Sequence, residues 1–262
     1  MTRGRHVPLV IPTTPPEVVV YDEPQACPYL NGMTAVLPLR VPTRMLRSSE
    51  FDERLESGDR RQGMFLYRTA CPSCRACEPI RLDVDTFAMN RTQRRVMERG
   101  DRELRIEIGT PMADMRRVEL YNLHKELRGL GESQSRIDLD GYREFLVMTC
   151  CDSFEMRYFS GSELIGVALV DRGQRALSAV YCYYDPNYGR LSLGTYSILR
   201  QVELCKTWGL QHLYLGLYIG DCERMRYKAR FSPHERLIDG IWTTFSKAKH
   251  SERASKPPER IP

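Results

Sequence analysis

The sequence predicts an α/β fold in which helices flank a mixed β-sheet. Two observations in the second half of the chain support this. Apolar runs and alternating apolar residues over 155–186 predict a meander of strands with a turn at Gly161. Residues 193–209 then place apolar side chains at helical spacing and the apolar run 212–219 follows, so the order is strand, helix, strand.

Each element has its own local signal. Residues 111–127 begin with a proline and repeat apolar side chains at close to helical spacing, which predicts a helix. The helix over 193–209 starts after a Gly-Thr turn and stops at Gly209, and the strand over 176–186 ends at Pro186. The other expected elements are short helices over 140–151 and 222–231, strands over 155–161, 164–173 and 212–219, and a closing strand over 235–245. This order fits the acetyltransferase-type acyl-transfer fold.

We expect four segments along the chain. They are a flexible N-terminal segment over residues 1–25 with five prolines, a Cys- and Arg-rich N-terminal domain over 26–150, an acetyltransferase-like (GNAT-type) domain over 151–246, and a flexible tail over 247–262.

The composition is that of an ordinary globular protein, with 42% hydrophobic and 28% charged residues in a chain of 262. No apolar run approaches the roughly 18 residues that suggest a membrane span. Prolines interrupt the apolar pieces near the N-terminus, so no secretory signal is expected. The odd count of nine cysteines argues against a disulfide framework, and the cytoplasm, where thiols stay reduced, is the expected compartment.

The net charge of +5 is modest, but its distribution is uneven. Every basic residue from Arg40 to Arg105 is an arginine. Arginine binds phosphates through two parallel hydrogen bonds and stacks on bases, which suits a phosphate-rich partner. A solvated surface with interspersed acidic residues explains the same pattern, and charge alone favours that simpler interpretation.

Three thiols stand close together in the stretch CPSCRAC. Cys71, Cys74 and Cys77 have the spacing of metal ligands, and Cys27 is the best fourth candidate. Four thiolates suit Zn²⁺ or an iron–sulfur cluster, while packed reduced thiols are the alternative. No histidine lies near them in sequence to serve as a base, so a holding role is favoured over catalysis. The other five cysteines stand in apolar contexts and are expected in the core.

A series of motifs in fixed order resembles the bacterial aspartate/glutamate leucyltransferases and the related arginyl-tRNA–protein transferases. The motifs are CPYL, RRQG, YRTACPSCRACEPIRL and RTQRR in the first half, and YYDP, SLGTYSIL, YLGLYI and MRYKARFSPHE in the second. Together they cover roughly residues 25–245. The chain departs from the family after CPYL, where Asn31-Gly32-Met33 replaces a Pro-Gly-Arg type stretch, and at Gly58-Asp59-Arg60-Arg61, where the family has Gly-Phe-Arg-Arg.

This resemblance implies an aminoacyltransferase that moves an amino acid, with leucine favoured, from charged tRNA to an N-terminal Asp or Glu and so marks proteins for N-degron degradation. The aminoacyl ester is already activated, so the chemistry needs no cofactor; the expected partners are aminoacyl-tRNA and acceptor proteins, without a membrane, and a monomer is one option. Arginyl transfer is an alternative. A CoA-dependent N-acyltransferase is another, although only Gly194 stands where such enzymes have Gly-x-Gly. A non-catalytic, metal-containing RNA-binding protein is the third.

The resemblance also suggests site residues. Asp185, at the end of a strand, is the first candidate to receive the proton of the amine, although an Asp-Pro turn is common without any function. With it, Tyr184, Ser192 and Thr195 form the expected catalytic set. The expected substrate-binding residues are Arg60, Arg61, Arg68, Arg94, Arg95, Arg190, Gly194, Tyr218, Tyr227 and Lys228. One arginine should read the acidic side chain of the acceptor, and Arg94-Arg95 suit tRNA phosphates.

Overall fold

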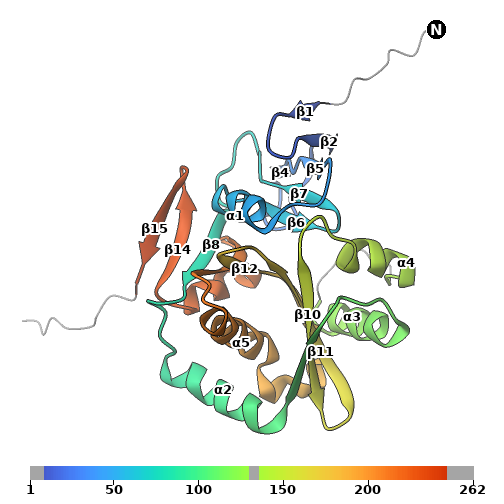
Figure 1. Cartoon of the computed structure of the whole chain (residues 1–262), viewed down its shortest axis with the longest axis vertical. Helices are drawn as coiled ribbons and strands as arrows, with labels where there is room; N and C mark the ends of the chain where they lie inside the picture. The colour runs from blue at the N-terminus through green and yellow to red at the C-terminus, as the bar shows by residue number, and fades with distance from the viewer. Residues whose placement is uncertain (1–8, 130–135, 247–262) are drawn as a thin grey trace, which may run out of the picture.

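The computed structural model describes residues 9–129 and 136–246 (Figure 1). Its centre is a mixed sheet of eight strands in the order β15-β14-β8-β13-β12-β11-β10-β9. The strands are β8 (Glu78–Asp83), β9 (Arg105–Gly109), β10 (Ser153–Ser160), β11 (Glu163–Arg172), β12 (Ala176–Tyr184), β13 (His212–Tyr218), β14 (His234–Ile238) and β15 (Ile241–Phe245). All neighbours run antiparallel except β12 and β13, which are parallel.

Helix α5 (Leu193–Thr207) makes the crossover between the two parallel strands. It buries Tyr196, Leu199 and Val202 against the sheet and ends before Gly209, whose positive φ reverses the chain. Helix α2 (Arg91–Glu103) lies beside it, as Figure 1 shows, and a Cβ at Gly100 would stand 2.3 Å from the Tyr196 ring. Only glycine therefore lets the two helices approach this closely.

The opposite face of the sheet is covered by α3 (Met115–Leu127), α4 (Leu139–Tyr142) and the π-helix η1 (Arg143–Val147). Asp114 caps α3 by accepting a hydrogen bond from the amide of Arg117. Aromatic rings fill the space between these helices and β12, among them Tyr121, Tyr142 and Tyr183. This aromatic layer fixes β12 from behind and leaves its other face to α5.

A second sheet, built from the N-terminal part, stands against one end of the large sheet (Figure 1). Its order is β1-β2-β5-β7-β6, and a separate pair is formed by β3 and β4. The bounds are β1 (Val10–Ile11), β2 (Glu17–Tyr21), β3 (Gln25–Ala26), β4 (Thr34–Ala35), β5 (Leu39–Pro42), α1 (Ser48–Glu56), β6 (Arg60–Gln62) and β7 (Phe65–Tyr67). Phe51 and Leu55 of α1 pack with Tyr214 of β13, so this sheet directly adjoins the parallel pair.

The remaining described elements follow the ends of β12 and β13. They are the 3-10 helix η2 (Pro186–Leu191), the short helix α6 (Glu223–Arg226) and the 3-10 helix η3 (Tyr227–Arg230). Within the described residues, no helix has the length and apolar character needed to cross a bilayer.

The structure confirms the mixed α/β fold and corrects three expectations. Residues 10–21 are not flexible, because β2 pairs with both β1 and β5; residues 1–8 and the tail over 247–262 lie outside the described residues. The chain does not divide near residue 150, because β8 and β9 belong to the large sheet. The closing strand over 235–245 is a hairpin, because Asp239 and Gly240 both have positive φ and make a tight turn.

Candidate active site

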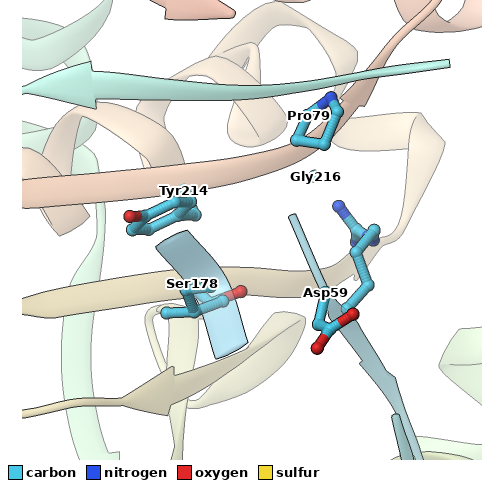
Figure 2. A pocket seen from close by; sticks show the side chains of 7 residues that line it. Asp59, Pro79, Ser178, Tyr214 and Gly216 are labelled. Carbon is cyan, nitrogen blue, oxygen red and sulfur yellow. The ribbon is translucent and has the colours of Figure 1, made fainter. Parts of the chain in front are cut away.

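The parallel strands β12 and β13 separate partway along their length. They pair through Ala176, Leu177 and Ser178 on β12, opposite His212, Leu213 and Tyr214 on β13, and diverge beyond that point. We call this region the split. Figure 2 shows the small cavity at its base, with Asp59, Pro79, Ser178, Tyr214 and Gly216 around it. About 10 Å³ is open there, the room that one water molecule needs.

The guanidinium of Arg60 reaches into the split from β6. Arg60 is half-buried and lines the cavity, and a Cβ at Gly216 would stand 1.4 Å from its Nη1 atom. Gly216, with φ of +83°, therefore leaves the space that the guanidinium fills. The side chain of Arg60 makes no hydrogen bond or ion pair with any residue of the described ranges. A half-buried guanidinium without an acidic partner is suited to an anion, and substrate binding by Arg60 stays a prediction.

Two tyrosines stand within the electrostatic reach of Arg60. Burial raises the pKa of Tyr29 to about 12 and that of Tyr227 to about 12, in both cases despite the opposing effect of Arg60. Both phenols therefore stay protonated at neutral pH and can donate hydrogen bonds. Tyr227 is 39% exposed, so it lies where the site opens to solvent.

Lys228 is buried beside these groups, with 7% of its surface exposed. Its Nζ donates a hydrogen bond of 2.7 Å to the carbonyl oxygen of Leu217, three residues beyond Tyr214, the last residue of β13 that pairs with β12. Burial, and then the charge of Arg60, lower the pKa of Lys228 well below its usual value. The site thus holds one fixed cation and one amine that is driven toward its neutral form.

Asp185 and Tyr184 end β12 on the other side of the split. The Asp185 Oδ1 accepts a hydrogen bond of 2.8 Å from the amide of Asn187 at the start of η2, and the residue is 9% exposed. This hydrogen bond is the turn-forming role that was the alternative for Asp185, and its catalytic role stays a prediction. The Tyr184 hydroxyl accepts a hydrogen bond of 3.2 Å from Arg128, and its ring lies 4.7 Å from that of His124.

The start of α5 lies close to the Tyr184 side chain. A Cβ at Gly194 would lie 3.6 Å from the Tyr184 ring. Ser192 precedes the helix in a left-handed conformation, φ 50°, and its side chain makes no capping hydrogen bond; its backbone oxygen instead accepts from the amide of Thr195. Ser192 is exposed and Thr195 half-buried, so no hydroxyl of this pair is committed to capping. Their catalytic role stays a prediction.

The predicted arginines have different surroundings. Arg61 was expected to bind substrate, but it is 5% exposed and pairs with the buried Asp171 at 2.7 Å, so it supports the fold. Arg68 pairs with Asp59 at 2.9 Å, and the exposed Arg190 pairs with Glu103.

Three predicted binding residues remain. Arg94 and Arg95 are exposed in the first turn of α2. The guanidinium of Arg236 stacks on one face of the Tyr218 ring, with its Cζ atom 4.5 Å from the ring centre.

The four predicted metal ligands gather in one region. Burial, and then Cys71, Cys27 and Cys74, raise the pKa of Cys77 to about 12, which places their thiols near one another. Among the residues described, however, no three His, Cys, Asp or Glu side chains are arranged around one point as ligands. The thiols as placed therefore do not fit a metal without rearrangement, and a metal at Cys27, Cys71, Cys74 and Cys77 stays a prediction.

Metal analysis of anaerobically purified protein tests this prediction. If the cysteines hold Zn²⁺ or an iron–sulfur cluster, the protein contains close to one equivalent, and Cys74→Ser lowers that content because it removes a half-buried thiolate ligand. Protein that is active and folded but essentially free of metal would contradict it. Cys205→Ser is the matched control, because this buried thiol lies in α5.

Sequence reasoning missed Tyr29 and Gly216. Gly216 carried a usable signal, because a single glycine inside the apolar run of β13 indicates close approach by another group. Tyr29 carried none, since its neighbours Arg60 and Tyr67 come from distant β6 and β7.

A mixed sheet whose two parallel strands separate beside a half-buried arginine fits the acyl-transfer fold that the sequence predicts. The models of the arginine-tRNA-protein transferase family match over residues 25–95 for its N terminus and 116–238 for its C terminus. The chain belongs to this family.

Two curated relatives cover most of the chain. An aspartate/glutamate leucyltransferase from Chromobacterium violaceum is 38% identical over 84% of this chain and 91% of its own length. One from Thiobacillus denitrificans is 35% identical over 88% and 97%. Among solved structures, L-PGS from Bacillus licheniformis matches with a TM-score of 0.42 and 14% identity over 56% of this chain and 48% of its own. A likeness that weak carries no argument about function.

Proposed function

We propose that this chain moves leucine from charged tRNA to an N-terminal Asp or Glu of acceptor proteins. The names of its relatives support the reaction, since both are aspartate/glutamate leucyltransferases. The observation that supports an acidic acceptor is the unpaired guanidinium of Arg60 in the split. Acceptors would then carry a new N-terminal leucine that marks them for degradation, and a reaction that uses charged tRNA takes place in the cytoplasm.

The chemistry needs positioning more than activation. The α-amine of the acceptor attacks the carbonyl carbon of the aminoacyl ester, an amide bond forms, and the ester bond to the ribose oxygen breaks. The site must hold amine and carbonyl in contact and stabilise the oxyanion that develops. The protonated hydroxyls of Tyr29 and Tyr227 are donors close to Arg60 that suit this second task.

Arg60 accounts for the choice of an acidic acceptor. Its guanidinium offers two parallel donors to a carboxylate, and no acid of the described residues competes for them. An amide in place of the carboxylate lacks the charge, so Asn and Gln should bind much more weakly.

An arginine ridge beside the site supports the tRNA side of the proposal. Six exposed arginines lie near the start of α2 and around α6 and η3, and none forms an ion pair with a described residue: Arg91, Arg94, Arg95, Arg224, Arg226 and Arg230. Gln93 of α2 donates to the carbonyl oxygen of Arg230 at 3.4 Å, which joins the two groups. Since Tyr227 and Lys228 belong to η3, phosphates bound along the ridge end close to the split.

Replacing Arg94 and Arg95 together by glutamine should weaken tRNA binding without changing acceptor choice. Each lost phosphate contact removes about one unit from the slope of log affinity against log salt. We expect that slope to fall by about 1–2 in a filter-binding titration. Arg105→Gln, which removes an exposed arginine on the edge strand β9, is the control. An unchanged slope in the double variant would contradict the role of the ridge.

Mass spectrometry of a test peptide incubated with enzyme and charged tRNA tests the proposal as a whole. Peptides starting with Asp or Glu should gain the mass of leucine, and those starting with Asn or Gln should not. Gain of an arginyl mass would establish arginyl transfer instead. Absence of any transfer, together with tight binding of CoA by calorimetry, would favour a CoA-dependent acyltransferase.

A further inference from the structure

The placement of Lys228 has no explanation in the stability of the fold. A buried amine normally pairs with an acid, yet among the described residues its Nζ hydrogen-bonds only to the carbonyl oxygen of Leu217 at 2.7 Å and the sulfur of Met225 at 3.7 Å. Neither partner carries a negative charge that would balance a protonated amine. A buried lysine of this kind costs stability and persists where its amine has a task.

The position of Lys228 relative to Arg60 suggests what that task is. Arg60 lies on Gly216 and Lys228 bonds to the carbonyl of the next residue, Leu217, so their side-chain ends meet adjacent residues of β13 in the split. Two titratable groups face the amine: Arg60 from β6 and the Cys222 thiol before α6. Arg60 opposes protonation of Lys228 and Cys222 favours it, and burial is the largest effect of all.

We infer that Lys228 accepts the proton of the acceptor's α-ammonium and returns it to the ribose oxygen that leaves. This rests on the proposed aminoacyl transfer. In the first step the N–H bond of the ammonium breaks and its proton moves to the lone pair of Nζ. The neutral amine then attacks the ester carbonyl, and its nitrogen loses a second proton to solvent. The carbon–oxygen bond to the ribose breaks, and the Lys228 ammonium protonates the ribose oxygen. Charge and protons balance, and Lys228 ends neutral.

The acidic acceptor itself would enable this step. Before it binds, the charge of Arg60 opposes a second charge on Lys228. A carboxylate on the guanidinium offsets that charge, and Lys228 then holds a proton more readily. An acceptor without the carboxylate leaves Lys228 a poor base, so acidic side chains are selected by rate as well as by binding.

The test is the pH dependence of kcat/KM for Lys228→Met in the full chain, with an Asp-peptide and leucyl-tRNA. At pH 6.5 we expect a loss of about 100-fold, the usual contribution of a positioned base. At pH 9 the acceptor amine, whose ordinary pKa is about 7.7–8.0, is already neutral, so the variant should recover to within about tenfold of wild type. The exposed Lys206→Met is the matched control and should match wild type at both pH values.

The outcomes separate the alternatives. Methionine fills the same volume without a buried polar group, so Lys228→Met should melt no lower than wild type. Lys228→Arg keeps a charge but cannot accept a proton, so at pH 6.5 it should lose activity as Lys228→Met does. Equal losses for Lys228→Met at pH 6.5 and pH 9 would overturn the inference while leaving the proposed function intact. A wild-type protein that transfers nothing from any charged tRNA would overturn both.

Discussion

Arg60→Gln should lower kcat/KM for peptides that begin with Asp or Glu by roughly 100-fold, equivalent to about 2.7 kcal/mol. The variant keeps a polar side chain but loses the charge that pairs with the carboxylate. Since the Arg60 side chain makes no hydrogen bond or ion pair with a described residue, the substitution breaks no internal ion pair, and the fold should be unchanged. Steady-state kinetics with leucyl-tRNA in excess measures the loss.

Two companion variants sharpen this result. Arg60→Lys keeps the charge but lacks the two parallel donors, so it should recover only part of the activity. Arg105→Gln removes an exposed arginine on the far edge of the sheet and should behave as wild type. Full activity of Arg60→Gln on Asp-peptides would show that another group reads the acceptor.

Arg61→Met should be strongly destabilising, lowering the free energy of unfolding by about 3–5 kcal/mol. Burial alone would lower the pKa of the Arg61 guanidinium, but the Asp171 carboxylate outweighs it and raises the pKa. The same guanidinium also donates to the carbonyl oxygens of Gly63 and Met148. Removing it leaves the Asp171 charge buried and these oxygens without a donor. Chemical denaturation followed by circular dichroism measures the effect.

Removing both charges should cost less than removing one. Arg61→Met combined with Asp171→Leu eliminates the buried carboxylate and should recover part of the loss. Arg68→Gln is the matched control, because this arginine is half-exposed where it pairs with Asp59, and exposed pairs contribute about 0–1 kcal/mol. A cost below about 1 kcal/mol for Arg61→Met would contradict the assigned structural role.

The fold was predictable where its signals are local. The periodicity of residues 193–209 and the apolar run after it were enough to predict α5 and β13, and both are confirmed. The position of β8 was not predictable, because its partners β13 and β14 are more than a hundred residues away in sequence. No local pattern contains such a pairing.

The sequence also did not distinguish the roles of two neighbouring site residues. Arg60 and Arg61 were both expected to bind substrate, and the motif does not distinguish them. In strand β6 their side chains point to opposite faces, so Arg60 enters the split and Arg61 meets the buried Asp171. The choice between them depends on the strand and on what lies on each side of it. The role of Asp185 was ambiguous for a related reason, since a turn and a catalytic position need the same residue.

The proposed function depends most on the pairing of Arg60 with the acceptor's carboxylate. A double comparison tests it: kcat/KM for an Asp-peptide and for the matching Asn-peptide, each with wild type and with Arg60→Gln. Wild type should prefer Asp by roughly 100-fold, and in the variant this preference should fall to near one, because the lost charge can no longer distinguish acid from amide. A preference for Asp that survives in Arg60→Gln would contradict the pairing of Arg60 with the acceptor's carboxylate.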